Sequence, residues 1–207
     1  MILDGATMNE ELNSDQKITE SFLEVCRWAY ICFTYHEEIG AGLKKIRGVA
    51  GEPRWRSRAA PYFFHDLSAI MQEYTLLQMA KLHDEAETYG KTNISIHYIK
   101  EKLNWNRDEK QAINSIVAKM TEFYKRIKDA RNKVIAHNDR NAYQDNHRLG
   151  CFIAEQDNEW FGCLEELADR VSQKFLGVPY SLSEDSFATT DVNEFLQIVE
   201  KGIFSAR

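Results

Sequence analysis

Proline and glycine are scarce in this chain, which has only 3 prolines and 10 glycines among 207 residues. Both residues interrupt regular structure, so their scarcity favours long helices over many short strands. Long apolar runs are also missing. No stretch approaches 18 uninterrupted apolar residues, and residues 1–16 lack the basic and apolar regions of a signal peptide. We therefore expect a soluble, cytoplasmic protein without a membrane span.

Cofactor and metal motifs are missing too. The chain has no P-loop, no GxGxxG and no GxSxG sequence, and its histidines show neither HExxH nor paired Cys/His spacing. Cys26, Cys32, Cys151 and Cys163 form no CxxC pair, which is typical of reduced thiols in a reducing compartment. We expect no metal and no cofactor.

The residues that are present indicate a folded helical domain. Apolar residues make up 43% and charged residues 28% of the chain, as in globular proteins, and the formal net charge of −6 argues against non-specific coating of nucleic acid. Apolar spacing predicts one all-α domain over 1–207. Its antiparallel bundle of four to five main helices spans 15–175, and 180–207 is an extension with a further helix. The expected helices cover about 15–38, 61–83, 95–103, 107–137, 158–175 and 191–203.

Two of these helices carry wide apolar faces. The first is so apolar around its girth that it must be central or covered by a second subunit. In the second, Phe63, Leu67, Ile70, Tyr74 and Leu77 form the predicted inward stripe. Between them, residues 40–60 contain four glycines and a proline, and 44–58 carry six positive charges against one negative. We predict a mobile basic loop there.

The fourth predicted helix contains an anomaly. Its apolar positions include Tyr124 and Ile127, and Arg131 follows Ile127 by four residues, so this arginine lies within the apolar stripe. A guanidinium keeps its charge and needs a carboxylate, a phosphate or water at such a position. His137 lies at the other edge of the stripe, about 120° around and about 9 Å along the helix from Arg131. Two copies of the chain would bring such groups into one cleft more easily than a single helix.

A purely structural interpretation also accounts for these residues. An arginine in an apolar stripe is often an internal ion pair, here with an acid such as Asp66 or Glu73. A histidine near a helix end is often a cap.

The run Arg131-Asn132-Lys133-Val134-Ile135-Ala136-His137 resembles the signature of HEPN domains: an arginine, a polar neighbour, then a histidine after a short spacer. It lies at the end of a long late helix, as in that family. Asn138-Asp139, the segment Leu82-His83-Asp84 and the run 92–96 are similar to the abortive-infection, AbiU-type branch. The resemblance covers roughly 15–175.

The resemblance implies a metal-independent endoribonuclease that acts as a toxin or antiphage effector, with Arg131, His137 and Asn132 as its catalytic residues. It also implies a homodimer through the face that carries Arg131 and His137, and an antitoxin or nucleotidyltransferase as a further partner. The alternative is a non-catalytic module that binds RNA, a nucleotide or a partner protein. Residues 123–148 carry seven basic against three acidic residues, and Trp55 is able to stack on a base. The expected RNA contacts are Lys128, Lys133, Asn138, Asp139, Arg140, Arg54, Trp55 and Arg56.

Overall fold

The computed structural model describes residues 5–50, 61–130, 154–184 and 187–205. In these ranges the protein is an all-α bundle with one short hairpin, which confirms the predicted fold class. The helices are α1 (Gly5–Ala50), α3 (Pro61–Leu82), α4 (Ile96–Lys102), α5 (Arg107–Ala130), α7 (Ala154–Phe175) and α8 (Ala188–Ser205). The strands β1 (Glu87–Thr88) and β2 (Lys91–Thr92) pair antiparallel.

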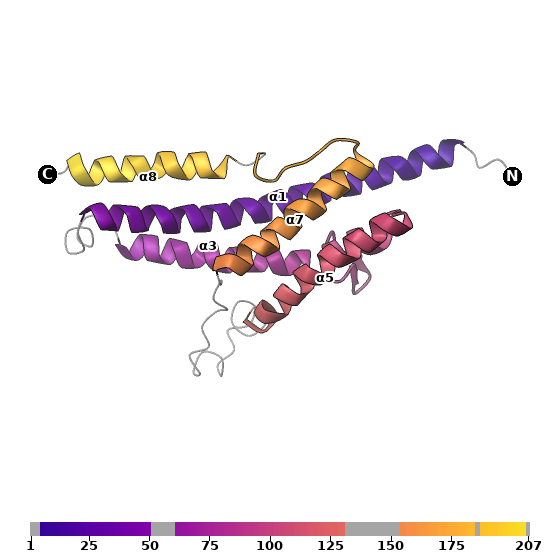
Figure 1. The fold of residues 1–207 in the computed structure, drawn as a ribbon, viewed down its shortest axis with the longest axis horizontal. Helices are drawn as coiled ribbons and strands as arrows, with labels where there is room; N and C mark the ends of the chain where they lie inside the picture. Colours follow the sequence, from indigo (N-terminus) through magenta and orange to yellow (C-terminus); the bar gives the residue numbers. More distant parts are fainter. Residues whose placement is uncertain (1–4, 51–60, 131–153, 185–186, 206–207) are drawn as a thin grey trace.

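Helix α1 is the central element. It runs through most of the length of the molecule, with α3 antiparallel beside it, α7 crossing it obliquely and α8 lying along its C-terminal half (Figure 1). Helix α5 packs on α7, and α4 packs on α5. Helix α1 contacts three other helices, and these contacts account for the apolar residues around its whole circumference. The sequence had allowed either this central position or a contact with a second subunit.

The core lies where α1, α3, α5 and α7 meet. Phe22, Cys26 and Ala29 of α1 are fully buried there. Phe33 of α1 stacks on Phe161 of α7, with the ring centroids 4.0 Å apart. In α7 the residues at helical spacing on one face are all buried, namely Trp160, Leu164, Leu167 and Val171. Burial of this apolar stripe is the main force that holds α7 in place.

The predicted loop over 40–60 is wrong for its first half, because α1 continues to Ala50. Each glycine inside a helix costs up to about 1 kcal/mol, but packing offsets such a preference. Helix α8 packs on this part of α1, and Gly42 allows the approach. A Cβ atom at Gly42 would lie 2.0 Å from Leu196 Cδ1. Residues 51–60 lie outside the described residues.

The stripe predicted for α3 is also wrong. Phe63, Ile70 and Tyr74 are 57%, 60% and 37% exposed, whereas Leu76 and Met79 are buried. Apolar residues occur around the whole girth of α3, so their spacing does not define one face. The direction in which α1 packs decides which of them are buried.

The helix ends follow local sequence signals. Ser95 caps α4, and its side chain accepts a hydrogen bond from the Tyr98 amide. Asn106 caps α5. Gly177, with φ +74°, follows the end of α7. The hairpin was not predicted. It turns at Tyr89 and Gly90, whose φ angles of 52° and 72° are those of a type I′ turn.

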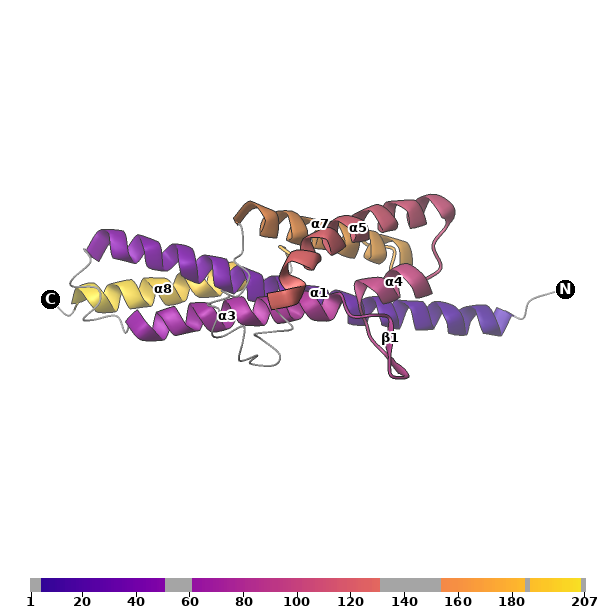
Figure 2. The ribbon, with the colours of Figure 1, turned by 90° about the horizontal axis from the view of Figure 1, so that it is seen from below.

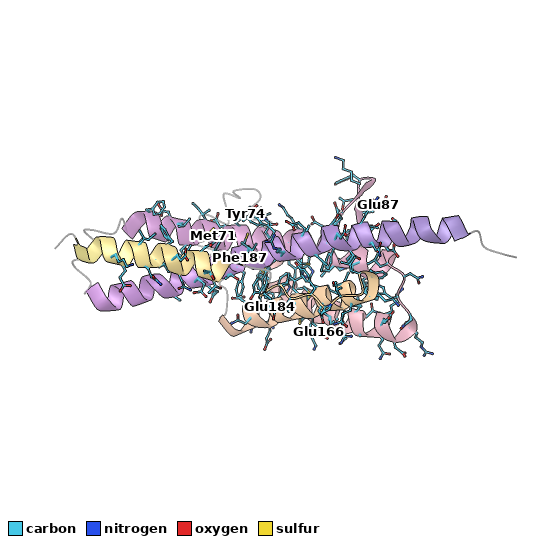
Figure 3. The ribbon with its side chains drawn as sticks, turned by 90° about the horizontal axis from the view of Figure 1, so that it is seen from above. Met71, Tyr74, Glu87, Glu166, Glu184 and Phe187 are labelled. Atoms are coloured by element: carbon cyan, nitrogen blue, oxygen red, sulfur yellow. The ribbon has the colours of Figure 1, made fainter. Side chains whose placement is uncertain are left out.

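The hairpin projects on the side of α1 and α3 that faces away from α5 and α7 (Figure 2). Figure 3 labels Glu87 in this hairpin and Phe187 just before α8, which begins three residues earlier than predicted. None of the described helices combines the length and the apolar composition that a membrane crossing requires.

Candidate functional site

Helix α5 is described as far as Ala130, the residue directly before the predicted Arg131–His137 motif. The apolar stripe predicted through Tyr124 and Ile127 faces inward. Tyr124 is half-buried, and the buried residues of this face are Ile113, Ile116, Val117, Met120 and Ile127. Arg131 follows Ile127 by four residues. The described part of α5 therefore has the inward stripe from which the position of Arg131 was predicted, and the position itself stays a prediction.

Of the predicted site residues, only Lys128 is described, and it is exposed on α5. The others lie outside the described residues: Arg131, Asn132, Lys133, His137, Asn138, Asp139 and Arg140 of the motif region, and Arg54, Trp55 and Arg56 of the basic segment. Their roles stay predictions.

The two helices that flank the motif segment are aligned at both ends. Arg126 of α5 donates a hydrogen bond to Gln156 of α7 at one end, and Lys174 of α7 forms a 3.0 Å ion pair with Glu109 of α5 at the other. The last turn of α5 therefore lies beside the first turn of α7, as Figure 1 shows. The described residues on either side of 131–153, Ala130 and Ala154, therefore belong to neighbouring helix ends.

A buried histidine, His83, contacts both α5 and α7 near this end of α5. The indole Nε1 of Trp160 donates a 3.3 Å hydrogen bond to Nε2 of His83, and the His83 ring stacks on Tyr124. Burial, and then the nearby His97, lower the pKa of His83 from 6.5 to about 3. Because Nε2 accepts, the neutral ring carries its hydrogen on Nδ1, for which the described structure offers no partner. His83 is thus a neutral core residue that does not exchange a proton near pH 7.

A buried acid lies in the first turn of α7. Asp157 is 2% exposed, and its Oδ1 has no hydrogen-bond partner in the described structure. Burial, and then the charge of Glu37, raise the pKa of Asp157 from 3.8 to about 7. By contrast, Asp66 and Glu73, the acids predicted as internal partners of Arg131, are exposed.

Sequence reasoning missed Asp157 because it started this helix at residue 158. Asp157 precedes Trp160 by three residues and Leu164 by seven, so it belongs to the same buried stripe. An earlier helix start would have revealed it.

A cavity of about 420 Å³ lies between α5 and α7 beside the Arg126–Gln156 contact. Its wall includes Lys119, Glu159, Glu166 and the partly buried Cys163. Two acids against one base do not suit a phosphate. No cluster of three or more His, Cys, Asp or Glu side chains in the described ranges is arranged to hold a metal ion.

The helical bundle, with its Arg–x₅–His segment after α5, defines the class of the protein: it is a HEPN-type helical domain. Within this class, the sequence model of the HEPN family AbiU2 matches residues 16–195, and the chain belongs to that family. The match extends into the segment 180–207, for which the sequence suggested no relationship. No curated protein and no solved structure matches the chain.

Proposed function

We propose that this protein is a metal-independent endoribonuclease, acting as a toxin or antiphage effector, with Arg131 and His137 as its catalytic pair. Membership of the HEPN family supports the proposal. The observation that carries it is the inward stripe of α5, which runs through Met120, Tyr124 and Ile127 to the last turn before Arg131. A permanently charged side chain at the predicted next position of this stripe needs a carboxylate, a phosphate or water, and a phosphate of RNA is such a partner.

The chemistry follows from the two side chains. His137 removes the proton from a ribose 2′-OH, whose oxygen attacks the adjacent phosphorus while the bond from phosphorus to the 5′-oxygen breaks. A second histidine protonates the leaving 5′-oxygen. The products are a 2′,3′-cyclic phosphate and a 5′-hydroxyl. An imidazole suits both proton transfers because its unperturbed pKa is about 6.5.

Arg131 binds the phosphate and stabilises the charge that develops on it, using the planar fork of the guanidinium. Asn132 orients His137 or contacts the phosphate. A homodimer through the face that carries the motif supplies two such pairs, so that one protomer's His137 acts as base and its partner's as acid.

The test is cleavage of total RNA in EDTA by wild type, Arg131→Ala and His137→Ala, with folding checked by thermal unfolding. We expect both variants to lose cleavage by about a hundredfold or more. Lys125→Ala is the matched control. Lys125 is exposed on α5, where it pairs with Glu122 at 2.9 Å, and its loss should leave cleavage nearly unchanged. The 5′ fragment should end in a cyclic phosphate.

Two results would contradict the proposal. If both variants still cleave RNA, Arg131 and His137 are not the catalytic residues. An absence of cleavage for every RNA, together with retained RNA binding, would instead identify the non-catalytic HEPN module.

A further inference from the structure

A second cavity lies between α1, α3 and the residues beside the hairpin. Figure 2 shows that this hairpin projects on the side of α1 and α3 away from α5 and α7. The volume of the cavity is about 520 Å³, within the range of small-molecule sites. We call it the hairpin pocket. Its walls include Glu24 and Trp28 of α1, Gln78 and Lys81 of α3, and Asp84 and Asn93 beside the hairpin.

Gln78 is the strongest sign that this pocket takes a ligand. The residue is 3% exposed, yet no acceptor in the described structure pairs with its amide Nε2. A buried amide donor without an acceptor is unfavourable, and native proteins seldom keep one. Gln78 lines the pocket, so a turn of its side chain would let a carbonyl or ring nitrogen of a ligand there supply the missing acceptor.

Trp28 adds an aromatic wall. It is 45% exposed, and its Nε1 donates a 3.3 Å hydrogen bond to the Tyr74 hydroxyl. The two rings also meet edge to face, with the centroids 6.4 Å apart. Figure 3 labels Tyr74 on α3, from where it contacts α1. An indole that is fixed at its edge and open to solvent provides a platform on which a planar ring stacks.

The remaining walls offer an acceptor and a mixed charge. Asn93 uses its Nδ2 for hydrogen bonds to the Glu85 carbonyl at 2.8 Å and to Thr88 Oγ1 at 3.0 Å, so it presents Oδ1 as an acceptor. Lys81 is the pocket's one described cation, against the carboxylates of Glu24 and Asp84. This balance disfavours a triphosphate and suits an uncharged ring with at most one phosphate.

We propose that the hairpin pocket binds a nucleobase. A base supplies a planar ring for Trp28, an acceptor for the Gln78 amide and a donor for Asn93. The base belongs either to a free nucleotide or to single-stranded RNA. None of the described residues that line the pocket belongs to the Arg131–His137 motif, so binding there can be tested without cleavage.

The test is calorimetric titration of the full-length protein with the four nucleoside 5′-monophosphates and with a 2′-O-methyl hexanucleotide, which cannot be cleaved through its 2′-oxygen. At least one ligand should saturate the protein. Gln78→Met and Trp28→Leu should each weaken binding by about tenfold or more, since stacking and a buried hydrogen bond are lost. A monophosphate that binds as tightly as the hexanucleotide identifies a free nucleotide. A much tighter hexanucleotide, whose affinity also falls in the two pocket variants, identifies RNA.

Two controls keep the test specific. Gln111→Met changes an exposed glutamine of α5, and Trp105→Phe changes an indole that lines another cavity, so both should bind as wild type does. Gln78→Met should also melt no lower than wild type, because it removes an unpaired donor. If Gln78→Met does not fold, Trp28→Leu decides. Binding that is unchanged in the folded pocket variants, or no saturation by any ligand, overturns the proposal but does not affect the proposed cleavage.

Discussion

The ring of His83 lies flat against the ring of Tyr124, with their centroids 4.3 Å apart and their planes 2° from parallel. The same imidazole accepts a hydrogen bond from Trp160. One neutral side chain at the end of α3 therefore joins α5 to α7. The stability of the bundle should therefore depend on the His83 imidazole remaining uncharged.

Acid should destabilise the protein through His83. Its pKa is about 3 in the folded state and near 6.5 when unfolded, so only the unfolded state binds a proton between these values. The free energy of unfolding should fall as pH decreases from 6.5 to 3, by at most about 1.4 kcal/mol per pH unit. Urea unfolding at a series of pH values measures this slope.

The variant that isolates the effect is His83→Phe, which keeps a ring against Tyr124 but cannot take up a proton. It should lose about 1–3 kcal/mol at pH 7, because the Trp160 indole is left unpaired, and its stability should vary less with pH. His97→Gln should raise the pKa of His83, since His97 contributes to lowering it. An unchanged pH slope in His83→Phe would refute this explanation.

Asp157 should act in the opposite direction. Its pKa of about 7 in the folded state lies above the ordinary 3.8, so the folded state keeps a proton that the unfolded state loses. This contribution to stability is full below pH 3.8 and is lost as pH rises to about 7. Asp157→Asn should therefore stabilise the protein at pH 8, by about 1–3 kcal/mol, and much less at pH 4.

Thermal or urea unfolding at the two pH values checks this prediction. Glu37→Gln is the companion variant, because loss of that charge should lower the pKa of Asp157 and reduce the effect of Asp157→Asn. An Asp157→Asn protein that is less stable than wild type at pH 8 would mean that the carboxylate has a partner. The same measurements in the Asp157→Asn background separate the His83 slope from the opposing slope of Asp157.

Local signals predicted much of this fold. Helix caps such as Asn106, and the buried stripes of α5 and α7, follow from side-chain chemistry and 3.6-residue spacing. Such signals depend on neighbours within one helix and survive in any tertiary context. They also brought out the motif at Arg131 and His137, whose role remains a prediction.

Tertiary packing determines the features of the fold that the sequence did not predict. The glycines near residue 40 indicated a loop, but contact with α8 keeps that part of α1 helical. The spacing of Phe63 and Ile70 matched a buried stripe, but both residues are exposed, whereas Leu76 and Met79 of the same helix are buried. The unpaired amide of Gln78 has no sequence signature, because only the folded structure shows which donors are left without acceptors.

The N-terminus of α5 should depend on Asn106. Its Oδ1 accepts a 2.9 Å hydrogen bond from the Glu109 amide, and the Glu109 carboxylate accepts one from the Asn106 amide at 2.9 Å. Asn106→Ala should lower the free energy of unfolding by about 1 kcal/mol. Asn104→Ala, at an exposed position before the cap, is the control and should change little. Equal effects of the two variants in urea unfolding would show that the cap does not matter.

The contact between α1 and α8 makes a sharp prediction about two glycines in one helix. At Gly42 an added Cβ would lie 2.0 Å from Leu196 Cδ1, whereas at Gly40 no atom lies within 4 Å. Gly42→Ala should therefore destabilise the protein by about 1–3 kcal/mol through overpacking. Gly40→Ala should stabilise it by up to about 1 kcal/mol, because alanine favours the helix.

Chemical unfolding shows whether each of the two variants lowers or raises the free energy of unfolding. The double variant Gly42→Ala with Leu196→Ala tests whether overpacking against Leu196 is the cause. Shortening Leu196 removes the colliding atoms, so its cost should be smaller in the Gly42→Ala background than in wild type. If Gly42→Ala stabilises the protein as Gly40→Ala does, α8 does not approach α1 closely at this point. The glycine would then have no packing role, and the helical extension of α1 beyond residue 40 would need another explanation.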